Sequence, residues 1–131
     1  MYKSTIIKFF SAAHICKNTI DFKEKRLHGH NFKVLITMEG EQFINDELFN
    51  FYKLKQMCKF IDENYDHAVL LNIKDNDTIT FCKHNNFPIV AFSKDPSSGF
   101  IAKRIFEILK LRQVPILSVT VTDNTLLRLE D

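Results

Sequence analysis

The sequence predicts an α+β fold in which two helices cover one face of a four-stranded antiparallel sheet. Three segments alternate apolar and polar residues as strands do, and they occupy residues 3–14, 28–39 and the region from residue 116, with a short fourth strand after Asn124. Two other segments, 50–64 and 96–111, repeat apolar residues at helical spacing. This order of strands, helices and strands is typical of an antiparallel sheet with its helices on one face.

The composition indicates one globular domain that spans residues 1–131. Hydrophobic residues make up 45% of the chain, with 3 Gly and 3 Pro, and the net charge is +2, so no basic excess points to nucleic acid. The chain has no apolar run that resembles a signal peptide or a membrane span. The 3 cysteines form no CxxC pair, which argues against disulfides or a zinc–thiolate cluster. We therefore expect a cytoplasmic protein that binds neither membrane nor nucleic acid.

The first two strands are expected to form an antiparallel hairpin. Residues 3–14 are rich in β-branched and aromatic side chains, and the polar stretch 17–26 reads as a loop. Residues 28–39 alternate most regularly of all, and Gly40 ends that strand. The loop therefore joins two long neighbouring strands.

The helices are expected after this hairpin. Residues 50–64 form the first, and Pro96 opens the second, which Ser97 or Ser98 caps and which ends before Pro115. Between the two helices the pattern is less regular, with a short helix in DNDTITFCKH and a short strand in PIVAF. An open sheet of this size leaves strand edges unpaired, and such edges favour pairing with a second copy of the chain, so we expect a homo-oligomer.

Three of the five histidines fall in the predicted hairpin, and this arrangement predicts a metal site. His28 and His30 project to the same side of their strand, and an antiparallel neighbour can bring His14 opposite them. Three imidazoles with one open position are the pattern of catalytic zinc, because the open position receives water or substrate. The alternative is that the two histidines of the HxH pair are ordinary surface or core residues.

Several motifs resemble the 6-pyruvoyl-tetrahydropterin synthase and 6-carboxy-tetrahydropterin synthase family. FSAAH (10–14) and LHGHNF (27–32) are the most specific. The likeness extends in order through NFYKLK (50–55), YDHAVLLN (65–72), DPSSGFIAKRI (95–105) and VTVTDN (119–124). The resemblance implies the tunnelling fold, or T-fold, in which the sheets of three subunits join into a barrel. It further implies that two trimers stack into a hexamer with active sites at subunit boundaries.

The resemblance also implies roles for particular residues. By analogy with the family, His14, His28 and His30 are the zinc ligands. Asp66 and His67 match the Asp-His pair that relays a proton, a task suited to a histidine oriented by a carboxylate. The implied substrate is dihydroneopterin triphosphate, whose side-chain oxygens Zn²⁺ would polarise so that a neighbouring carbon-bound proton is easier to remove.

The family's substrate-binding motifs are only partly kept. Ser97 and Ser98 retain the hydroxyls of the family's Pro-Thr-Thr/Ala pattern, whereas Gly99 replaces its helix-start glutamate. Asp123 corresponds to the late glutamate that holds the amino and ring N–H groups of the pterin. A carboxylate at this position still accepts two hydrogen bonds, although its side chain is one methylene shorter.

The family's catalytic cysteine is absent from the loop before the HGH motif. Glu24 stands at the corresponding position, as in a subgroup that makes 6-hydroxymethyl-dihydropterin for folate synthesis. Glu24 could act as the base if partial burial raised its pKa, or it could be a solvated member of the charged run KEKR. Cys16, two residues after His14, is a second candidate for the missing role, and otherwise a buried structural thiol.

The function predicted from these observations is a zinc-dependent lyase of the 6-carboxy- or 6-pyruvoyl-tetrahydropterin synthase type. Queuosine, folate and biopterin synthesis are the pathways open to it. The alternatives are a glutamate-dependent enzyme that forms 6-hydroxymethyl-dihydropterin, a non-catalytic homologue that binds metal or pterin, and a zinc hydrolase acting on another heterocycle.

Overall fold

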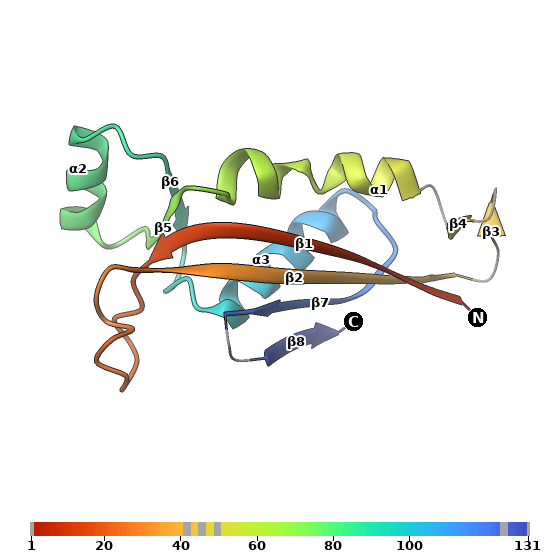
Figure 1. Cartoon of the computed structure of the whole chain (residues 1–131), viewed down its shortest axis with the longest axis horizontal. Helices are drawn as coiled ribbons and strands as arrows, with labels where there is room; N and C mark the ends of the chain where they lie inside the picture. Colours follow the sequence, from red (N-terminus) through yellow and green to blue (C-terminus); the bar gives the residue numbers. More distant parts are fainter. Residues whose placement is uncertain (1, 41–42, 45–46, 49–50, 124–125, 131) are drawn as a thin grey trace.

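The computed structural model describes residues 2–40, 43–44, 47–48, 51–123 and 126–130, and confirms the predicted α+β class (Figure 1). A six-stranded sheet has the order β6-β5-β1-β2-β7-β8. Its strands are β1 (Tyr2–His14), β2 (His28–Gly40), β5 (Val69–Asn72), β6 (Ile89–Phe92), β7 (Ile116–Thr122) and β8 (Leu126–Glu130). The helices are α1 (Phe51–Met57), the π-helical turn η1 (Ile61–Tyr65), α2 (Asn76–His84) and α3 (Ser98–Leu111), and the short strands β3 (Phe43–Ile44) and β4 (Glu47–Leu48) pair separately.

The predicted hairpin is confirmed, because β1 and β2 pair antiparallel along their whole length, from Tyr2 opposite Gly40 to His14 opposite His28. The polar segment between them forms a long loop at one end of the sheet (Figure 1). The last residues of β1 and the first residues of β2, which we call the closed end of the hairpin, are therefore next to this loop.

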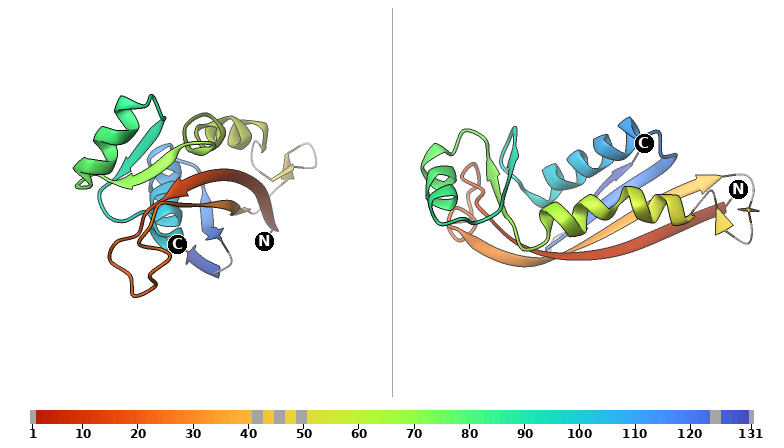
Figure 2. Two further views of the ribbon diagram at one scale, coloured as in Figure 1. Left: turned by 60° about the vertical axis from the view of Figure 1, so that its left-hand side comes forward. Right: turned by 90° about the horizontal axis from the view of Figure 1, so that it is seen from above.

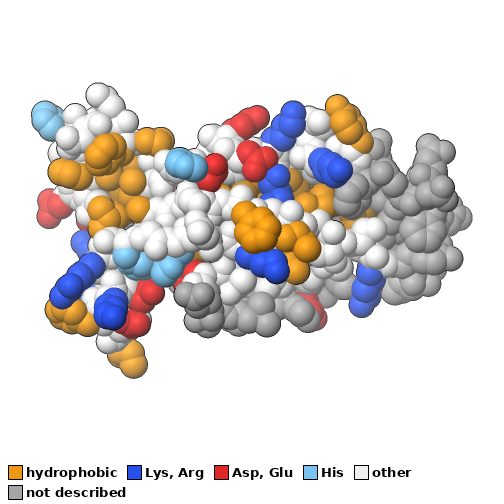
Figure 3. Space-filling model, in the orientation of Figure 1, with side chains coloured by type: hydrophobic (Ala, Val, Ile, Leu, Met, Phe, Trp, Pro, Cys, Tyr) orange, Lys and Arg blue, Asp and Glu red, His pale blue; other side chains and the backbone are white. Residues whose placement is uncertain are grey.

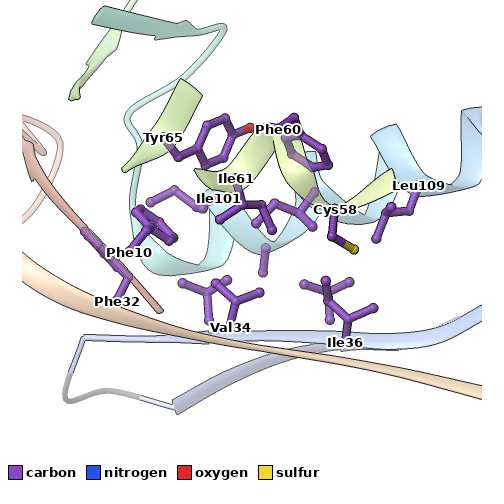
Figure 4. Packing of buried hydrophobic residues seen from close by; sticks show 14 of the residues in the cluster. Phe10, Phe32, Val34, Ile36, Cys58, Phe60, Ile61, Tyr65, Ile101 and Leu109 are labelled. Atoms are coloured by element: carbon purple, nitrogen blue, oxygen red, sulfur yellow. The ribbon is translucent and has the colours of Figure 1, made fainter. Parts of the chain in front are cut away.

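The core lies between the sheet and the two helices α1 and α3. Alternate residues of β2 point to this side, and Phe32, Val34, Ile36 and Met38 are fully buried. Leu54 and Cys58 from the α1 segment and Ile101, Ile105 and Leu109 from α3 belong to the same cluster. Figure 2 shows α1 and α3 on one side of the sheet, and Figure 4 shows side chains of α3 and of the segment that follows α1 meeting those of β1 and β2.

The prediction of a four-stranded antiparallel sheet is wrong in two respects. The main sheet has six strands, and β5 pairs parallel with both β1 and β6. Strand β5 is buried on both faces: Leu70 joins the main core, whereas Leu71 packs with Ile15 and Cys82 of α2 in a second cluster. A short strand covered on both sides shows no alternation, so its sequence does not separate it from a helix or loop.

The helix predictions hold in outline. Within the described residues, the helix expected at 50–64 begins at Phe51 and changes to the π-helical turn η1 at Ile61. Asn50 and Asn124, where the first helix and the fourth strand were expected to begin, lie outside the described residues. Helix α3 starts as predicted, with Ser97 as its N-cap. The short helix and strand expected between them are α2 and β6.

The opposite face of the β1–β2 ladder carries exposed apolar side chains. Ile7 and Phe9 are 54% and 64% exposed, although both lie in the middle of a long strand. Among the described residues, no helix is long and apolar enough to cross a membrane.

Candidate metal centre

Three histidines converge at the closed end of the β1–β2 hairpin. His14 stands opposite His28 in the ladder, and Ala12 stands opposite His30, so the three side chains project from the same face. The ring centroids lie 4.4 Å apart for His14 and His28, 4.7 Å for His28 and His30, and 5.0 Å for His14 and His30. The grouping that strand alternation predicted is thus present in the structure.

The buried ring of Phe32 supports two of these imidazoles from the core side. Its centroid lies 5.3 Å from the ring of His14 and 5.5 Å from that of His30, with the rings edge to face. Phe10 stacks on Phe32 at 4.9 Å, which continues the contact into the hydrophobic core. The histidines therefore rest on a packed aromatic layer, which restricts their rotamers.

Backbone carbonyls fix the tautomers of two histidines. The Nδ1 atom of His14 lies 2.7 Å from the carbonyl oxygen of Pro96, and Nδ1 of His28 lies 2.6 Å from that of Arg26. A carbonyl oxygen only accepts, so each Nδ1 carries the hydrogen and donates it. The Nε2 atoms of both rings are then available as electron-pair donors, which is how ligand histidines are commonly oriented.

The carbonyl of Pro96 is itself held in place by Asp95. One carboxylate oxygen of Asp95 accepts a hydrogen bond from the backbone N–H of Asn18 at 2.8 Å. The other accepts from the side-chain amide of Asn72 at 3.0 Å, at the end of β5. Asp95 therefore ties the segment after β1, the end of β5 and the start of α3 together around His14.

Glu24 reaches the same point from the loop between the strands. Its Oε2 lies 3.0 Å from Nε2 of His28 and 3.6 Å from Nε2 of His14, and its Oε1 lies 3.7 Å from Nε2 of His30. Of the described residues, His14, Glu24, His28 and His30 form one group whose ligand atoms all lie within 4.8 Å of one another. The alternative that Glu24 is merely a solvated member of a charged run does not fit this position.

The donor atoms are those that a metal ion requires. Within the described part of the chain, the Nε2 atoms of His14 and His30 are buried and have no hydrogen-bond partner. Burial lowers the pKa of His14, the bond to Pro96 opposes this, and the neighbouring imidazoles of His28 and His30 lower it further. A neutral imidazole with an unpartnered, buried nitrogen is suited to binding a cation.

A cavity of about 570 Å³ is lined by His14, His30 and Glu24. The start of α3 lines it with Ser97, Ser98 and Gly99, and Asp123 lines it after β7. Histidine side chains lie beside acidic ones at this part of the surface (Figure 3). The predicted binding residues therefore share one cavity with the predicted metal ligands.

The two serines differ in what their hydroxyls do. Ser97 Oγ accepts a hydrogen bond from the N–H of Phe100 at 3.2 Å as the N-cap of α3. Ser98 Oγ is buried and makes no hydrogen bond with any residue that the structure describes. Asp123 Oδ2 lies 3.6 Å from Nε2 of His30. Ser98 and Asp123 thus present polar atoms next to the histidines.

Cys16 also lines the cavity but is poorly suited to act as a thiolate. Its Sγ lies 3.8 Å from Nδ1 of His14. Burial raises the pKa of the Cys16 thiol to about 12, and the carboxylates of Asp95, Glu24 and Asp123 contribute in the same direction. The thiol is therefore protonated at neutral pH.

Asp66 and His67 are not brought to the histidine cluster within one chain. His67 Nδ1 lies 3.0 Å from Asp66 Oδ2, and Asp66 Oδ1 accepts from the N–H of Ser11 at 2.8 Å. His67 lines a second cavity, of about 540 Å³, whose lining shares only His30 with that of the first. His67 has a positive φ of 64° and a side chain that is 81% exposed. The turn thus presents this imidazole to the outside of the subunit.

Comparison with known proteins gives consistent results. A family model described as 6-pyruvoyl tetrahydropterin synthase matches residues 4–127. A protein of Archaeoglobus fulgidus, provisionally named a 6-carboxy-5,6,7,8-tetrahydropterin synthase, is 30% identical over 98 residues that cover 73% of this chain and 77% of that protein. The enzyme of the same name from Bacillus subtilis is 31% identical over 98 residues, which cover 74% of this chain and 58% of that protein.

Solved structures with the same fold include an uncharacterized protein from Wolinella succinogenes, with a TM-score of 0.84 and 19% identity over 99% of this chain and 98% of that one. Another is a 6-pyruvoyltetrahydropterin synthase from Plasmodium vivax, with a TM-score of 0.64 and 16% identity over 100% of this chain and 99% of that one. That structure is of a variant in which a glutamate, described as a catalytic residue, is replaced by alanine. The T-fold architecture predicted from the motifs is thereby confirmed.

Proposed function

Because the chain belongs to the 6-pyruvoyl tetrahydropterin synthase family, we propose that it is a zinc-dependent lyase that acts on the side chain of dihydroneopterin triphosphate. The observation that carries this proposal is the convergence of three histidines and the Glu24 carboxylate in one group, of which His14, His30 and Glu24 line a single cavity. His14, His28 and His30 would hold the metal. Zn²⁺ held there would polarise the hydroxyl or carbonyl oxygens of the substrate side chain.

Glu24 is the base in this proposal. Its carboxylate lies within 3.7 Å of all three histidines, so it stands beside any side chain bound in front of them. From there it can accept the proton that leaves a carbon next to a polarised oxygen. The neutral thiol of Cys16, with its pKa raised to about 12, is the poorer candidate. A glutamate is also described as catalytic in the Plasmodium vivax synthase.

Asp123 and Ser98 would orient the pterin ring. A carboxylate at Asp123 can accept hydrogen bonds from the ring N–H and the amino group, which are adjacent donors on a pterin. Ser98 Oγ, buried and without a hydrogen bond among the described residues, is available to a further polar atom of the ring. Ser97 contributes by holding the first turn of α3, on which Ser98 and Gly99 lie.

We propose that the protein works as a homo-oligomer, a trimer or hexamer, in which Asp66 and His67 serve the metal centre of a neighbouring subunit. Two observations support this: His67 lines a different cavity from Glu24, and Ile7 and Phe9 are exposed apolar residues on the outer sheet face. Co-purified mixtures of His28→Ala and His67→Ala subunits provide the test. Each variant alone should be inactive, whereas mixed oligomers should regain part of the activity; no recovery in verified mixed oligomers contradicts the shared site.

The product is first expected to be 6-carboxy-tetrahydropterin, by the names of the two curated relatives. A second candidate is 6-hydroxymethyl-dihydropterin, which the position of Glu24 at the three histidines favours, since the subgroup that carries glutamate in place of the cysteine forms it. Both reactions begin with removal of a side-chain proton and differ in which carbon–carbon or carbon–oxygen bond then breaks.

Product analysis decides between these reactions. The purified protein, loaded with zinc to one equivalent per chain, is incubated with dihydroneopterin triphosphate in the cytosolic pH range, and the pterins are identified by mass spectrometry. Either product, or 6-pyruvoyl-tetrahydropterin, supports the lyase. No turnover with zinc fully bound contradicts it, and binding of an unchanged pterin would then identify a non-catalytic homologue.

A further inference from the structure

We propose that Glu24 is itself the fourth ligand of the metal, and that it closes the coordination sphere until a substrate oxygen displaces it. The proposal rests on the metal site of the proposed function, but it concerns a different property of that site. It states that the resting centre is closed by a residue of the chain rather than by water.

The distances support direct ligation by Glu24. In a tetrahedral zinc site with bonds of about 2.0–2.1 Å, neighbouring ligand atoms lie about 3.3 Å apart. The separations between the Glu24 carboxylate and the three Nε2 atoms are 3.0, 3.6 and 3.7 Å, which bracket this value. Oε2 makes the contacts with His28 and His14 and Oε1 the contact with His30, so the carboxylate faces all three Nε2 atoms from the side where a fourth ligand would stand.

The chemistry of the donors leads to the same conclusion. Nδ1 of His14 and Nδ1 of His28 donate to carbonyls, so their Nε2 lone pairs face the carboxylate. A proton on Nε2 of His28 can satisfy its 3.0 Å contact with Glu24, but the Nε2 atoms of His14 and His30 face the carboxylate at 3.6 and 3.7 Å without a hydrogen bond, and such contacts are unfavourable without a cation between the atoms. A metal ion in the middle satisfies all four groups at once, including the buried Nε2 atoms that lack a partner in the described structure.

The loop presents Glu24 from an anchored backbone position. The carbonyl oxygen of Glu24 accepts a hydrogen bond of 2.9 Å from the N–H of Cys16, immediately after β1. The backbone at Glu24 is therefore fixed beside His14, while its side chain, 29% exposed, has room to move.

This arrangement couples substrate binding to the release of the base. If a side-chain oxygen of the substrate displaced it, the Glu24 carboxylate would remain beside the three histidines, where it could accept a proton from a carbon next to that oxygen. The carboxylate is thus kept from acting before substrate arrives.

Cobalt(II) substitution tests the proposal, because four-coordinate cobalt absorbs visible light far more strongly than five- or six-coordinate cobalt. The wild-type protein is compared with Glu24→Gln, Glu24→Ala and the control Asp21→Asn, which removes the same charge from the same loop and cavity. Competition with a chelator gives the Co²⁺ and Zn²⁺ affinities. Neopterin, which carries the trihydroxypropyl side chain, is the probe for displacement.

We expect both Glu24 variants to bind each metal about tenfold or more weakly, since even partners outside the ligand set typically cost about 10–100-fold. Their cobalt spectra should lose intensity, and Asp21→Asn should match wild type. Neopterin should alter the wild-type spectrum. Unchanged affinity and spectrum in both Glu24 variants overturn the proposal while leaving the three-histidine site intact. Failure of the wild-type protein to bind either metal overturns this proposal and the proposed function together.

Discussion

His14 and His28 stand opposite each other at the last position of the β1–β2 ladder, and each donates its Nδ1 hydrogen to a backbone carbonyl. The two carbonyls come from different parts of the chain, Pro96 before α3 and Arg26 in the loop before β2. The tautomer of each ring is therefore set by the fold rather than by a side chain that can rotate away. The orientation of the two Nε2 atoms follows directly.

Replacing His28 by alanine is expected to abolish zinc binding. The variant keeps the imidazoles of His14 and His30 and the carboxylate of Glu24. It loses the Nε2 atom of His28, which lies 3.0 Å from Glu24. Zinc at about 100 times its Kd stabilises a protein by about 2.7 kcal/mol, so the thermal shift on adding zinc should disappear in this variant. His84→Ala, on the exposed surface of α2, is the control and should keep the shift. An unchanged shift in His28→Ala would show that the metal binds elsewhere.

Glu24→Gln is expected to lower kcat by about 10²–10⁴-fold, the usual contribution of a positioned base. The assay is run with zinc raised until the variant is saturated, so that metal remains in place and only the proton acceptor is missing. Zinc content measured on the assayed sample is the control. Retained kcat in the saturated variant would eliminate Glu24 as the base.

Cys16→Ala should leave kcat within a few-fold of wild type. The pKa of Cys16 is raised to about 12 by burial, so the thiol is neutral and neither a nucleophile nor a base at pH 7. The native protein should also resist alkylation at this position, which peptide mass spectrometry after treatment with iodoacetamide can measure. A loss of activity as large as that of Glu24→Gln would return the catalytic role to Cys16.

The neighbouring serines should separate stability from binding. Ser97→Ala removes the N-cap of α3 and should destabilise the fold by about 1 kcal/mol. Ser98→Ala removes a buried hydroxyl without a hydrogen bond among the described residues, so it should leave the melting temperature unchanged or raise it. If Ser98 contacts the pterin, the KM of Ser98→Ala should nevertheless rise, by about 2–10-fold for one lost hydrogen bond. Equal melting curves and equal KM values for the two variants would contradict this division.

Asp66 should contribute to the acid sensitivity of the fold. The N–H of Ser11 and the side chain of His67 hold the pKa of Asp66 below its usual value of 3.8. A lowered pKa in the folded state means that the contribution is complete above the unfolded value and is lost as the pH falls through the lower folded value. Asp66→Asn should therefore lose less stability than wild type on acidification below about pH 4, as measured by urea unfolding. If the free energy of unfolding changed with pH in the same way in wild type and Asp66→Asn, the contacts of Asp66 with Ser11 and His67 would make no contribution to acid sensitivity.

Strand alternation was sufficient to predict the hairpin and the convergence of His14, His28 and His30. Both follow from local periodicity, because a side chain's face is fixed by its place in the strand. The serines and the preceding proline narrowed the cap of α3 to Ser97 or Ser98, and the structure shows that it is Ser97. The motifs of the family then extended the prediction to the tunnelling fold, which the structural comparisons confirm.

The parts that escaped prediction depend on contacts between distant segments. Strand β5 was missed because Leu70 and Leu71 are buried on opposite faces and leave no alternation to detect. The bond between His14 and Pro96 joins residues 82 positions apart, and no sequence pattern records it. Nor does the charged run KEKR indicate that Glu24, unlike its neighbours, turns toward three imidazoles.

All four proposed donors lie between His14 and His30, in one continuous stretch of chain. A metal bound to them joins no remote segments, and instead closes a single loop whose two ends the ladder already holds together. Pairing of the two strands therefore already accounts for most of the entropic cost of bringing the ligands together. On metal binding, the remaining cost is that of ordering the loop that carries Glu24. The strand–loop–strand unit from His14 to His30 therefore carries all four donors, and an antiparallel hairpin of another protein should acquire the same coordination if it has the same register, a comparable aromatic contact and a carbonyl in the place of that of Pro96.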